Sequence, residues 1–378
     1  MKKISRKSFL KKGLLGTATL SVAAGGCLGS SDVGTDGSTE GTNNRRYRWN
    51  MVTTWPPNYP IIGEGLVEMT QWIESMSGGR LKIKVYGGGE LIPALECFDA
   101  VSSGTAEMGH GAAYYWAGKV PAAQFFGTVP FGLNAQQMNS WLLSGGGLTL
   151  WRELYDKYNL IPFPCGNTGV QMGGWFNKEI NSVDDLKGLK MRIPGFGGKV
   201  FARAGGAPVL AAGSELYTSL ERGVIDATEW IGPFHDYKMG LQDIAKYYYV
   251  PGWHEPGASL ELIVNKAKFN SLPADLQAIV ETAAMRFNNW MIAEMEVQNA
   301  LFLEKILEEG KVELRYFSDD VLNRLRELTD EMIAEVVASD DFARRVYESY
   351  DTHRQRARRW SAVTEKQFHN KLQAVPDE

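Results

Sequence analysis

The chain has 378 residues, of which 44% are apolar, 11% aromatic and 22% charged, the composition of an ordinary globular protein. This length allows two hydrophobic cores, because single cores stop growing beyond about 250–300 residues. The 40 basic and 44 acidic residues include no basic cluster interleaved with aromatic residues, which excludes a nucleic-acid surface and predicts no nucleic-acid partner.

The first 26 residues read as an export signal. A basic start, MKKISRKSFLKKG, precedes an apolar run over residues 14–24 that is too short to be a permanent membrane anchor. SRKSFLKK resembles a twin-arginine signal in which Lys7 replaces the second arginine, so the twin-arginine and general export routes both stay open. AAGGC resembles a bacterial lipobox, which makes Cys27 a candidate for lipidation; a plain signal cut nearby is the alternative.

Residues 27–46 are rich in Gly, Ser, Thr, Asp and Asn, and we expect a flexible tether that would suit a protein held at the outer face of a membrane. The leader carries six basic residues and no acidic one, so the chain from Cys27 onward has a net charge of −10. Beyond Cys27 there are two cysteines, Cys97 and Cys165, which could pair outside the cytoplasm or remain two buried thiols.

From Tyr47 onward, strand-like and helix-like segments alternate, which predicts βα units around a largely parallel sheet. A first lobe is expected over residues 47–165, to which later segments of the chain return, and a second over residues 166–272, with a ligand cleft between them. The predicted strands are 46–52, 81–88, 106–113, 160–166, 170–177, 189–195, 207–212 and 224–231, and the predicted helices are 61–77, 91–103, 135–158, 198–204 and 214–223. Ser214 is the expected N-cap of the last of these helices, and Gly223 follows its end.

One long helix is predicted over residues 273–310, because apolar periodicity continues through the whole segment. At ~1.5 Å per residue it would run about 50 Å, enough to cross both lobes. Residues 311–378 add a strand-like VELRYF and a charged helical tail from Asp319 to about Leu372. Such a tail either packs on a partner or lies as a solvated surface helix.

Enzyme motifs are missing from the sequence. GFGGKV matches neither a phosphate loop nor a dinucleotide turn, because Gly-Lys is not followed by Ser or Thr and Val200 stands in place of the third glycine. The five histidines show no HExxH spacing, no zinc-type Cys/His set is present, and no G-x-S-x-G elbow offers a nucleophile. These absences argue against transition-metal and nucleophilic catalysis.

Three charged residues stand at predicted strand ends. Arg192 precedes the end of its strand, where its type suits two parallel hydrogen bonds to a carboxylate. Glu229 follows VIDAT and Glu255 follows VPGW, and two carboxylates that converge in a poorly solvated site need a cation between them or must share a proton. The pattern alone favours a surface arginine and two separate surface glutamates.

Four motifs in a fixed order carry a resemblance. LKGLKMRIPG, ALECFDAVSSGTAEMGHG, SELYTSLERGVIDATEW and YYYVPGWHEPG resemble the extracytoplasmic solute-binding proteins of tripartite ATP-independent periplasmic (TRAP) transporters, in the branch that binds 2-oxo and 2-hydroxy monocarboxylates such as pyruvate and lactate. The likeness runs from about Tyr47 past the long helix. It implies a non-enzymatic receptor with a two-lobed periplasmic-binding-protein-like α/β fold, which delivers its ligand to membrane permease subunits.

The resemblance also implies roles for individual residues. Arg192 matches the arginine that pairs with the substrate carboxylate, and Tyr114 or Tyr115 would close the pocket from the first lobe. The positions matching a Na⁺ or Ca²⁺ site that also touches the substrate are Gln171, Glu229, Trp230 through its backbone carbonyl, and Glu255. Members of the branch form homodimers by exchanging a C-terminal helix, which would suit the tail after Asp319.

Two alternatives stay open from the sequence. A receptor for a dicarboxylate or a sugar acid is the nearer one, although a dicarboxylate should want a second fixed cation and none stands out beyond Arg192. A secreted glycoside hydrolase with Glu229 and Glu255 as acid and base is the alternative from another class, because aromatic-lined clefts also suit sugars.

Overall fold

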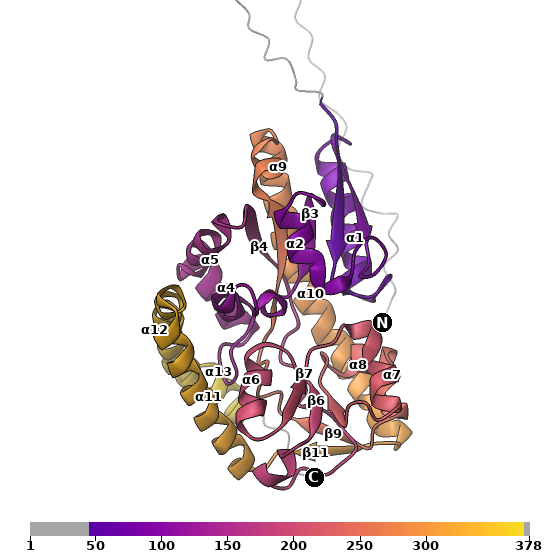
Figure 1. Ribbon diagram of the computed structural model, residues 1–378, viewed down its shortest axis with the longest axis vertical. Helices are drawn as coiled ribbons and strands as arrows, with labels where there is room; N and C mark the ends of the chain where they lie inside the picture. The colour runs from indigo at the N-terminus through magenta and orange to yellow at the C-terminus, as the bar shows by residue number, and fades with distance from the viewer. Residues whose placement is uncertain (1–44, 374–378) are drawn as a thin grey trace, which may run out of the picture. The chain divides into compact units, whose positions relative to one another are not determined.

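The computed structural model describes residues 45–373, so the leader, Cys27 and nearly all of the expected tether lie outside the described residues. Within that range the strands form two sheets, which confirms the expected α/β architecture (Figure 1). The first sheet has the order β2 (Leu81–Tyr86), β1 (Tyr47–Thr53), β3 (Met108–Gly111), β10 (Ser259–Asn265) and β4 (Leu160–Asn167). The second has the order β11 (Glu313–Tyr316), β9 (Tyr247–Val250), β5 (Gly174–Phe176), β8 (Ala227–Thr228), β6 (Lys190–Arg192) and β7 (Ala207–Val209).

Both sheets are mixed, which corrects the expectation of a largely parallel arrangement. Strand β1 pairs in parallel with β2 and β3, but β10 is antiparallel to both of its neighbours. In the second sheet β6 is parallel to β7 and β8, whereas β5 is antiparallel to β8 and β9. Strand β10 was not predicted, and it returns the chain from the second sheet to the first.

The helices agree with the predicted pattern only in part: α3 (Gln124–Gly127), α8 (Pro233–Lys238) and α9 (Lys266–Asn270) were not predicted, and the helix expected over 91–103 is an α-helix only over Cys97–Ser102. Two further differences have a local cause. The segment expected as one helix over 135–158 is two helices, because Gly146 has a φ of 91° that a continuing right-handed helix does not allow. Ser214 is not an N-cap, since it lies inside a 3₁₀ turn and the α-helix begins at Leu216. The other α-helices before the long one are α1 (Ile62–Met76), α2 (Cys97–Ser102), α4 (Ala135–Ser144), α5 (Gly147–Asp156), α6 (Gly195–Arg203) and α7 (Leu216–Glu221).

The predicted long helix is present as α10 (Ala274–Glu309), and it serves both sheets (Figure 1). It packs against β4 and α1 on the side of the first sheet and against α8 on the side of the second. Its buried positions include Leu276, Phe287, Met291 and Ile306, so its apolar surface is covered along most of its length. A single helix therefore connects the two halves of the protein, each of which is one sheet with the helices that pack on it.

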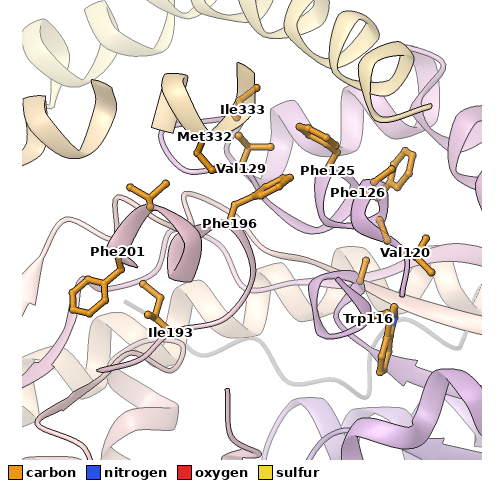
Figure 2. Packing of buried hydrophobic residues seen from close by; sticks show 14 of the residues in the cluster. Trp116, Val120, Phe125, Phe126, Val129, Ile193, Phe196, Phe201, Met332 and Ile333 are labelled. Atoms are coloured by element: carbon orange, nitrogen blue, oxygen red, sulfur yellow. The ribbon is translucent and has the colours of Figure 1, made fainter. Parts of the chain in front are cut away.

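The C-terminal tail consists of α11 (Asp319–Ser339), α12 (Asp341–Val363) and α13 (Glu365–Leu372). Helix α11 packs on α6, and α12 packs on α3, α4 and α5. Figure 2 shows Phe196 of α6 lying close to Val129 and to Met332 and Ile333 of α11, all of them in one buried apolar cluster. The first part of the tail thus packs against both halves of the protein, whereas α13 has no buried residue.

Cys97 and Cys165 are both buried and free, as one of the two sequence alternatives expects. Cys97 donates from Sγ to the carbonyl of Val52, and the Sγ of Cys165 lies 3.7 Å from the sulfur of Met69. Among residues 45–373, no helix combines the length and the apolar character needed to span a membrane.

Candidate functional site

Arg192 is the last residue of β6, and its side chain is only 1% exposed. The guanidinium forms an ion pair with Glu229, in which Nη1 donates to a carboxylate oxygen. Nε donates to the carbonyl of Ala211 at 3.3 Å, and Nη2 donates to the hydroxyl of Tyr115 at 3.2 Å. The expectation of a surface arginine was wrong, because Trp230 and Tyr115 cover its side chain.

Glu229 and Glu255 are brought together in the interior, so the expectation of two separate surface glutamates was wrong as well. They are 1% and 3% exposed, and with His254 they form a group whose potential ligand atoms all lie within 4.8 Å of one another. The pKa of Glu255 is raised well above its ordinary value, first by burial and second by the negative charge of Glu229. Two such carboxyl groups favour a cation or a proton between them.

Gln171 completes the oxygen-rich side of this group. Its amide Nε2 donates to Glu255 Oε2 at 2.7 Å and to the hydroxyl of Thr168 at 3.1 Å, while its backbone N–H donates to the carbonyl of Glu255. The amide oxygen Oε1 is buried and accepts no hydrogen bond from any residue in the range 45–373. Leaving a buried acceptor without a donor costs folding free energy. An oxygen in this state is suited to coordinate a cation.

Aromatic rings wall the site from several elements. The guanidinium carbon of Arg192 lies 4.9 Å from the ring centre of Trp230, whose indole N–H donates to Tyr59. The hydroxyl of Tyr115 accepts a hydrogen bond from Arg192. The rings of Tyr114 and Tyr115 pack edge to face, with their centres 5.0 Å apart. Both tyrosines come from the 3₁₀ helix η2 (Ala113–Trp116), so the structure places the two sequence candidates in one wall.

Gly195 allows that wall to approach the second sheet. It is the first residue of α6, directly after the turn that follows β6, with a φ of 58°, and a Cβ there would lie 2.9 Å from the Cβ of Tyr114. Any larger side chain would be strained by the backbone conformation and would also displace Tyr114. A glycine at this turn therefore sets the distance between η2 and the strand that carries Arg192.

His254 was missed by the sequence reasoning, although it stands next to Glu255 in WHEPG. The side chain is 1% exposed, and Nε2 lies 3.2 Å from Glu229 Oε2. An ionised carboxylate only accepts, so the imidazole donates this bond from Nε2. Glu229 is thus held by Arg192 at one oxygen and by His254 at the other, which fixes the orientation of its carboxylate.

We expect the His254 bond to orient Glu229 for cation binding. His254→Phe keeps a ring but removes the donor, and loss of such an orienting partner typically costs about 10- to 100-fold in metal affinity. His254→Gln retains an N–H donor near the position of Nε2 and should stay within a few-fold of the parent. Calcium titration of both variants by calorimetry checks this, and equal losses in the two would show that only packing matters.

The donor set is suited to a hard cation. Two carboxylates and one amide oxygen, all buried, are the oxygen ligands that Ca²⁺ and similar ions take, and one buried cationic arginine lies beside them for an anionic ligand. The residues that could hold the ion are Gln171, Glu229 and Glu255. The arrangement can therefore bind a cation and a small carboxylate side by side.

Residues 51–340 match the family described as bacterial extracellular solute-binding protein, family 7. The chain belongs to this family. A curated relative, a monocarboxylate 2-oxoacid-binding periplasmic protein of Nostoc sp., is 40% identical over 360 residues, which cover 95% of this chain and 98% of the relative. Membership confirms the resemblance to TRAP-transporter receptors, and it confirms a binding protein in place of the hydrolase alternative.

Two solved structures resemble this family 7 protein over nearly their whole length. A TRAP periplasmic solute-binding protein of Pseudoalteromonas atlantica, with bound sodium and pyruvate, is 43% identical with a TM-score of 0.85, and the match covers 86% of this chain and 99% of that one. A TRAP transporter solute-binding protein of Bordetella bronchiseptica is 37% identical with a TM-score of 0.85, covering 87% and 97%. The latter is a mixed-occupancy dimer, with copurified calcium and picolinate at one site and the other site apo.

Proposed function

We propose that this protein is the extracytoplasmic receptor of a TRAP transporter and binds a small 2-oxo or 2-hydroxy monocarboxylate, such as pyruvate or lactate, together with Na⁺ or Ca²⁺. The observation that carries this proposal is the buried Gln171 Oε1, which accepts no hydrogen bond from any described residue and lies beside two buried carboxylates and the buried Arg192. The ligands named for the relatives from Pseudoalteromonas atlantica and Nostoc sp. support the same substrate class.

The chemistry of a three-carbon acid explains why such a site is needed. A micromolar dissociation constant requires about 8 kcal/mol, and the best small ligands supply at most about 1.5 kcal/mol per heavy atom. Apolar packing around a methyl group contributes little, so directed contacts must supply most of the affinity. Arg192 would hold the carboxylate of the ligand. A cation held by Gln171, Glu229, Glu255 and the backbone carbonyl of Trp230 would contact the carboxylate and the 2-oxo or 2-hydroxy oxygen.

Binding is tested on protein freed of divalent metal by a chelator and then dialysed into a buffer without Na⁺. Pyruvate and lactate are titrated by calorimetry without added metal, with Na⁺ and with Ca²⁺. Binding that appears or tightens when one of the cations is added is the expected result, and native mass spectrometry should show acid and ion bound together. If neither acid binds in any of these conditions, while the protein is folded by circular dichroism, the proposal is wrong.

The surface of the C-terminal tail supports a homodimer. Large apolar side chains at the end of α12 and in α13 are exposed, with Trp360 at 68% and Leu372 at 77%. The relative from Bordetella bronchiseptica is described as a dimer. We propose that this part of the tail packs on a second copy of the chain.

Trp360→Ser combined with Leu372→Ser should convert the dimer to a monomer, because it removes two large apolar contacts from the interface. Size-exclusion chromatography with light scattering measures the mass directly. Val224→Ser is the matched control, since Val224 is 61% exposed and lies outside the tail. A parent protein that is already monomeric, or a double variant that stays dimeric, would contradict the role of the tail.

Localisation at the membrane is a separate part of the proposal. We propose that Cys27, which lies outside the described residues, carries a lipid after cleavage of the leader. The mass of the intact protein from its native host should then exceed that of the polypeptide from Cys27 by the mass of the lipid. A mass equal to the bare polypeptide would establish a freely diffusing receptor.

A further inference from the structure

Asp236 is a buried carboxylate of α8 that the proposed cation site does not use as a ligand. Its side chain is 1% exposed, and both carboxylate oxygens accept hydrogen bonds. Oδ2 accepts from the indole N–H of Trp175 at 2.9 Å and from the hydroxyl of Tyr248 at 2.7 Å. Oδ1 accepts from the backbone N–H groups of Ile231 and Gly232, both at 3.2 Å. These neutral donors fill the acceptor positions of an ionised carboxylate and fix its orientation.

The N–H of Ile231 belongs to the same peptide unit as the carbonyl of Trp230. This peptide bond is trans, and in a trans peptide the N–H and the C=O point in opposite directions. The hydrogen bond from Ile231 to Asp236 therefore turns the Trp230 carbonyl away from Asp236. That carbonyl directly follows Glu229, one of the two carboxylates of the candidate site.

The Trp230 carbonyl has no hydrogen-bond donor of its own in the structure. Trp230 is 4% exposed, and its carbonyl oxygen accepts no hydrogen bond from any residue in the described range. Buried backbone carbonyls are nearly always paired, so an unpaired one beside a carboxylate group calls for a partner. It is a second buried oxygen, after Gln171 Oε1, that is suited to coordinate a cation.

The segment between Trp230 and α8 is fixed from two sides. Helix α8 packs on the long helix α10 (Figure 1), and the N–H of Phe234 donates to Asn299 Oδ1 of α10 at 3.1 Å. On the other side the carbonyl of Ile231 accepts from the N–H of Met172 at 3.4 Å, and Met172 follows Gln171. The peptide unit that carries the Trp230 carbonyl is thus held relative to the other oxygens of the site.

We propose that Asp236 is a positioning residue for the cation, which holds the peptide unit between Trp230 and Ile231 so that the Trp230 carbonyl points into the cation site. The inference rests on the proposed function, in which this carbonyl is a ligand of the cation. A peptide fixed in advance need not turn when the ion arrives, and a charged acceptor on its N–H places more negative charge on its oxygen. Loss of such an orienting partner typically costs about 10- to 100-fold in metal affinity.

Selective isotope labelling observes this peptide unit directly. The dipeptide Trp-Ile occurs twice in the chain, at residues 72–73 inside α1 and at residues 230–231. Protein with ¹³C in the tryptophan carbonyls and ¹⁵N in the isoleucines therefore gives two correlated amide signals by NMR, and the α1 signal is the internal reference. When Ca²⁺ is added to the metal-free parent, the Trp230 carbonyl signal should shift while the α1 signal stays in place. The amide proton of Ile231 should lie downfield, as expected for a donor to a carboxylate.

The variants separate the orientation of the peptide from packing and from charge. Asp236→Ala removes the acceptor, so it should move the Ile231 amide proton upfield and weaken calcium binding about 10- to 100-fold by calorimetry. Trp175→Phe and Tyr248→Phe are the matched controls, because each removes a donor to Oδ2 and leaves Oδ1 in place. Both should keep the Ile231 signal and stay within a few-fold of the parent in calcium affinity.

Asp236→Asn keeps an oxygen that can accept from Ile231 but removes the charge. It should keep the Ile231 signal close to that of the parent and lose less calcium affinity than Asp236→Ala. If Asp236→Ala does not fold by circular dichroism, Asp236→Asn takes its place, and its loss of affinity should still follow the change in its Ile231 signal.

Three outcomes would overturn the proposal. These are a Trp230 carbonyl signal that does not move when calcium binds the parent, a loss of affinity in Tyr248→Phe equal to that in Asp236→Ala, and a loss in Asp236→Asn while the Ile231 signal stays at the parent position. Each leaves the proposed function intact, because calorimetry still reports binding of cation and pyruvate to the parent. A parent that binds neither Ca²⁺ nor Na⁺ would instead remove the proposed function, and this inference with it.

Discussion

Arg192→Ala should reduce the affinity for pyruvate roughly 30-fold to several thousandfold, the range for truncating one partner of a buried hydrogen-bonded charge pair. The guanidinium is 1% exposed and lies over Trp230, so water cannot replace it as a donor to the ligand. Arg192→Lys should recover only part of the affinity, because an ammonium cannot offer two parallel N–H donors to a carboxylate.

A matched control and a folding check accompany this variant. Arg203 lies on the next helix and pairs with Glu335 on the surface, so Arg203→Ala removes the same side chain without touching the site. Arg192→Ala leaves Glu229 buried without its cationic partner, which should destabilise the fold. Folding of the variant is therefore checked by thermal melts with added calcium, which supplies a positive charge to that carboxylate. If Arg192→Ala and Arg203→Ala bind pyruvate equally well, Arg192 does not hold the ligand.

The sequence predicts the residues of the site better than it predicts their environment. In the structure β6 ends at Arg192 and β8 ends directly before Glu229, within three residues of the expected strand ends, and the register pairs Arg192 with Thr228 on the adjacent strand. The end of a strand can be predicted from turn residues and local pattern. The adjacency of β6 and β8 cannot, because these strands pair across 36 residues of chain. The ion pair between Arg192 and Glu229 could therefore not be predicted from local pattern.

Burial of Arg192 illustrates a second limit. Alternation within Met191, Arg192 and Ile193 indicates which side chains share a face, and it suggests water on the polar face. Here that face is covered by Trp230 and by Tyr115, which comes from a distant segment of the chain. A cleft between two halves makes an interior surface out of residues that each half alone would expose, and only the tertiary arrangement reveals it.

The errors in the predicted secondary structure have two causes: contacts between segments distant in sequence, and local signals that were given too little weight. Strand β10 was missed because its seven residues are all buried, so it lacks an alternating pattern, and its partners β3 and β4 lie far away in sequence. The break between α4 and α5 has a local sequence signal, the three consecutive glycines at residues 145–147. The prediction of one helix followed the apolar periodicity and disregarded these glycines. Long helix α10 was predicted well because its 36 residues contain neither proline nor glycine, so no local signal ends the helix early.

Cation binding should release a proton from Glu255 at a pH between the ordinary and the raised pKa of this carboxyl. Burial and then the charge of Glu229 raise the pKa of this carboxyl well above its ordinary value, so it keeps its proton in the folded, metal-free protein at a pH where the unfolded chain has lost it. The stability that this protonated form contributes is present below the unfolded pKa of about 4.3 and is lost as the pH rises through the raised folded pKa. A cation requires the carboxylate, so it must displace the proton, and its affinity should rise with pH, up to about tenfold per unit.

Calorimetric calcium titrations in buffers of different ionisation enthalpy count the released protons. Glu255→Gln keeps the size of the side chain and an oxygen that can accept from Gln171, but it should end the proton release and weaken calcium by more than the roughly 10- to 100-fold that orienting partners cost. Glu261→Gln is the control, because burial also raises the pKa of Glu261, to about 7, while its bonds to Trp116 and Tyr155 place it outside the donor set. Proton release that persists in Glu255→Gln and disappears in Glu261→Gln would assign the titrating carboxyl to β10 and remove Glu255 from the cation site.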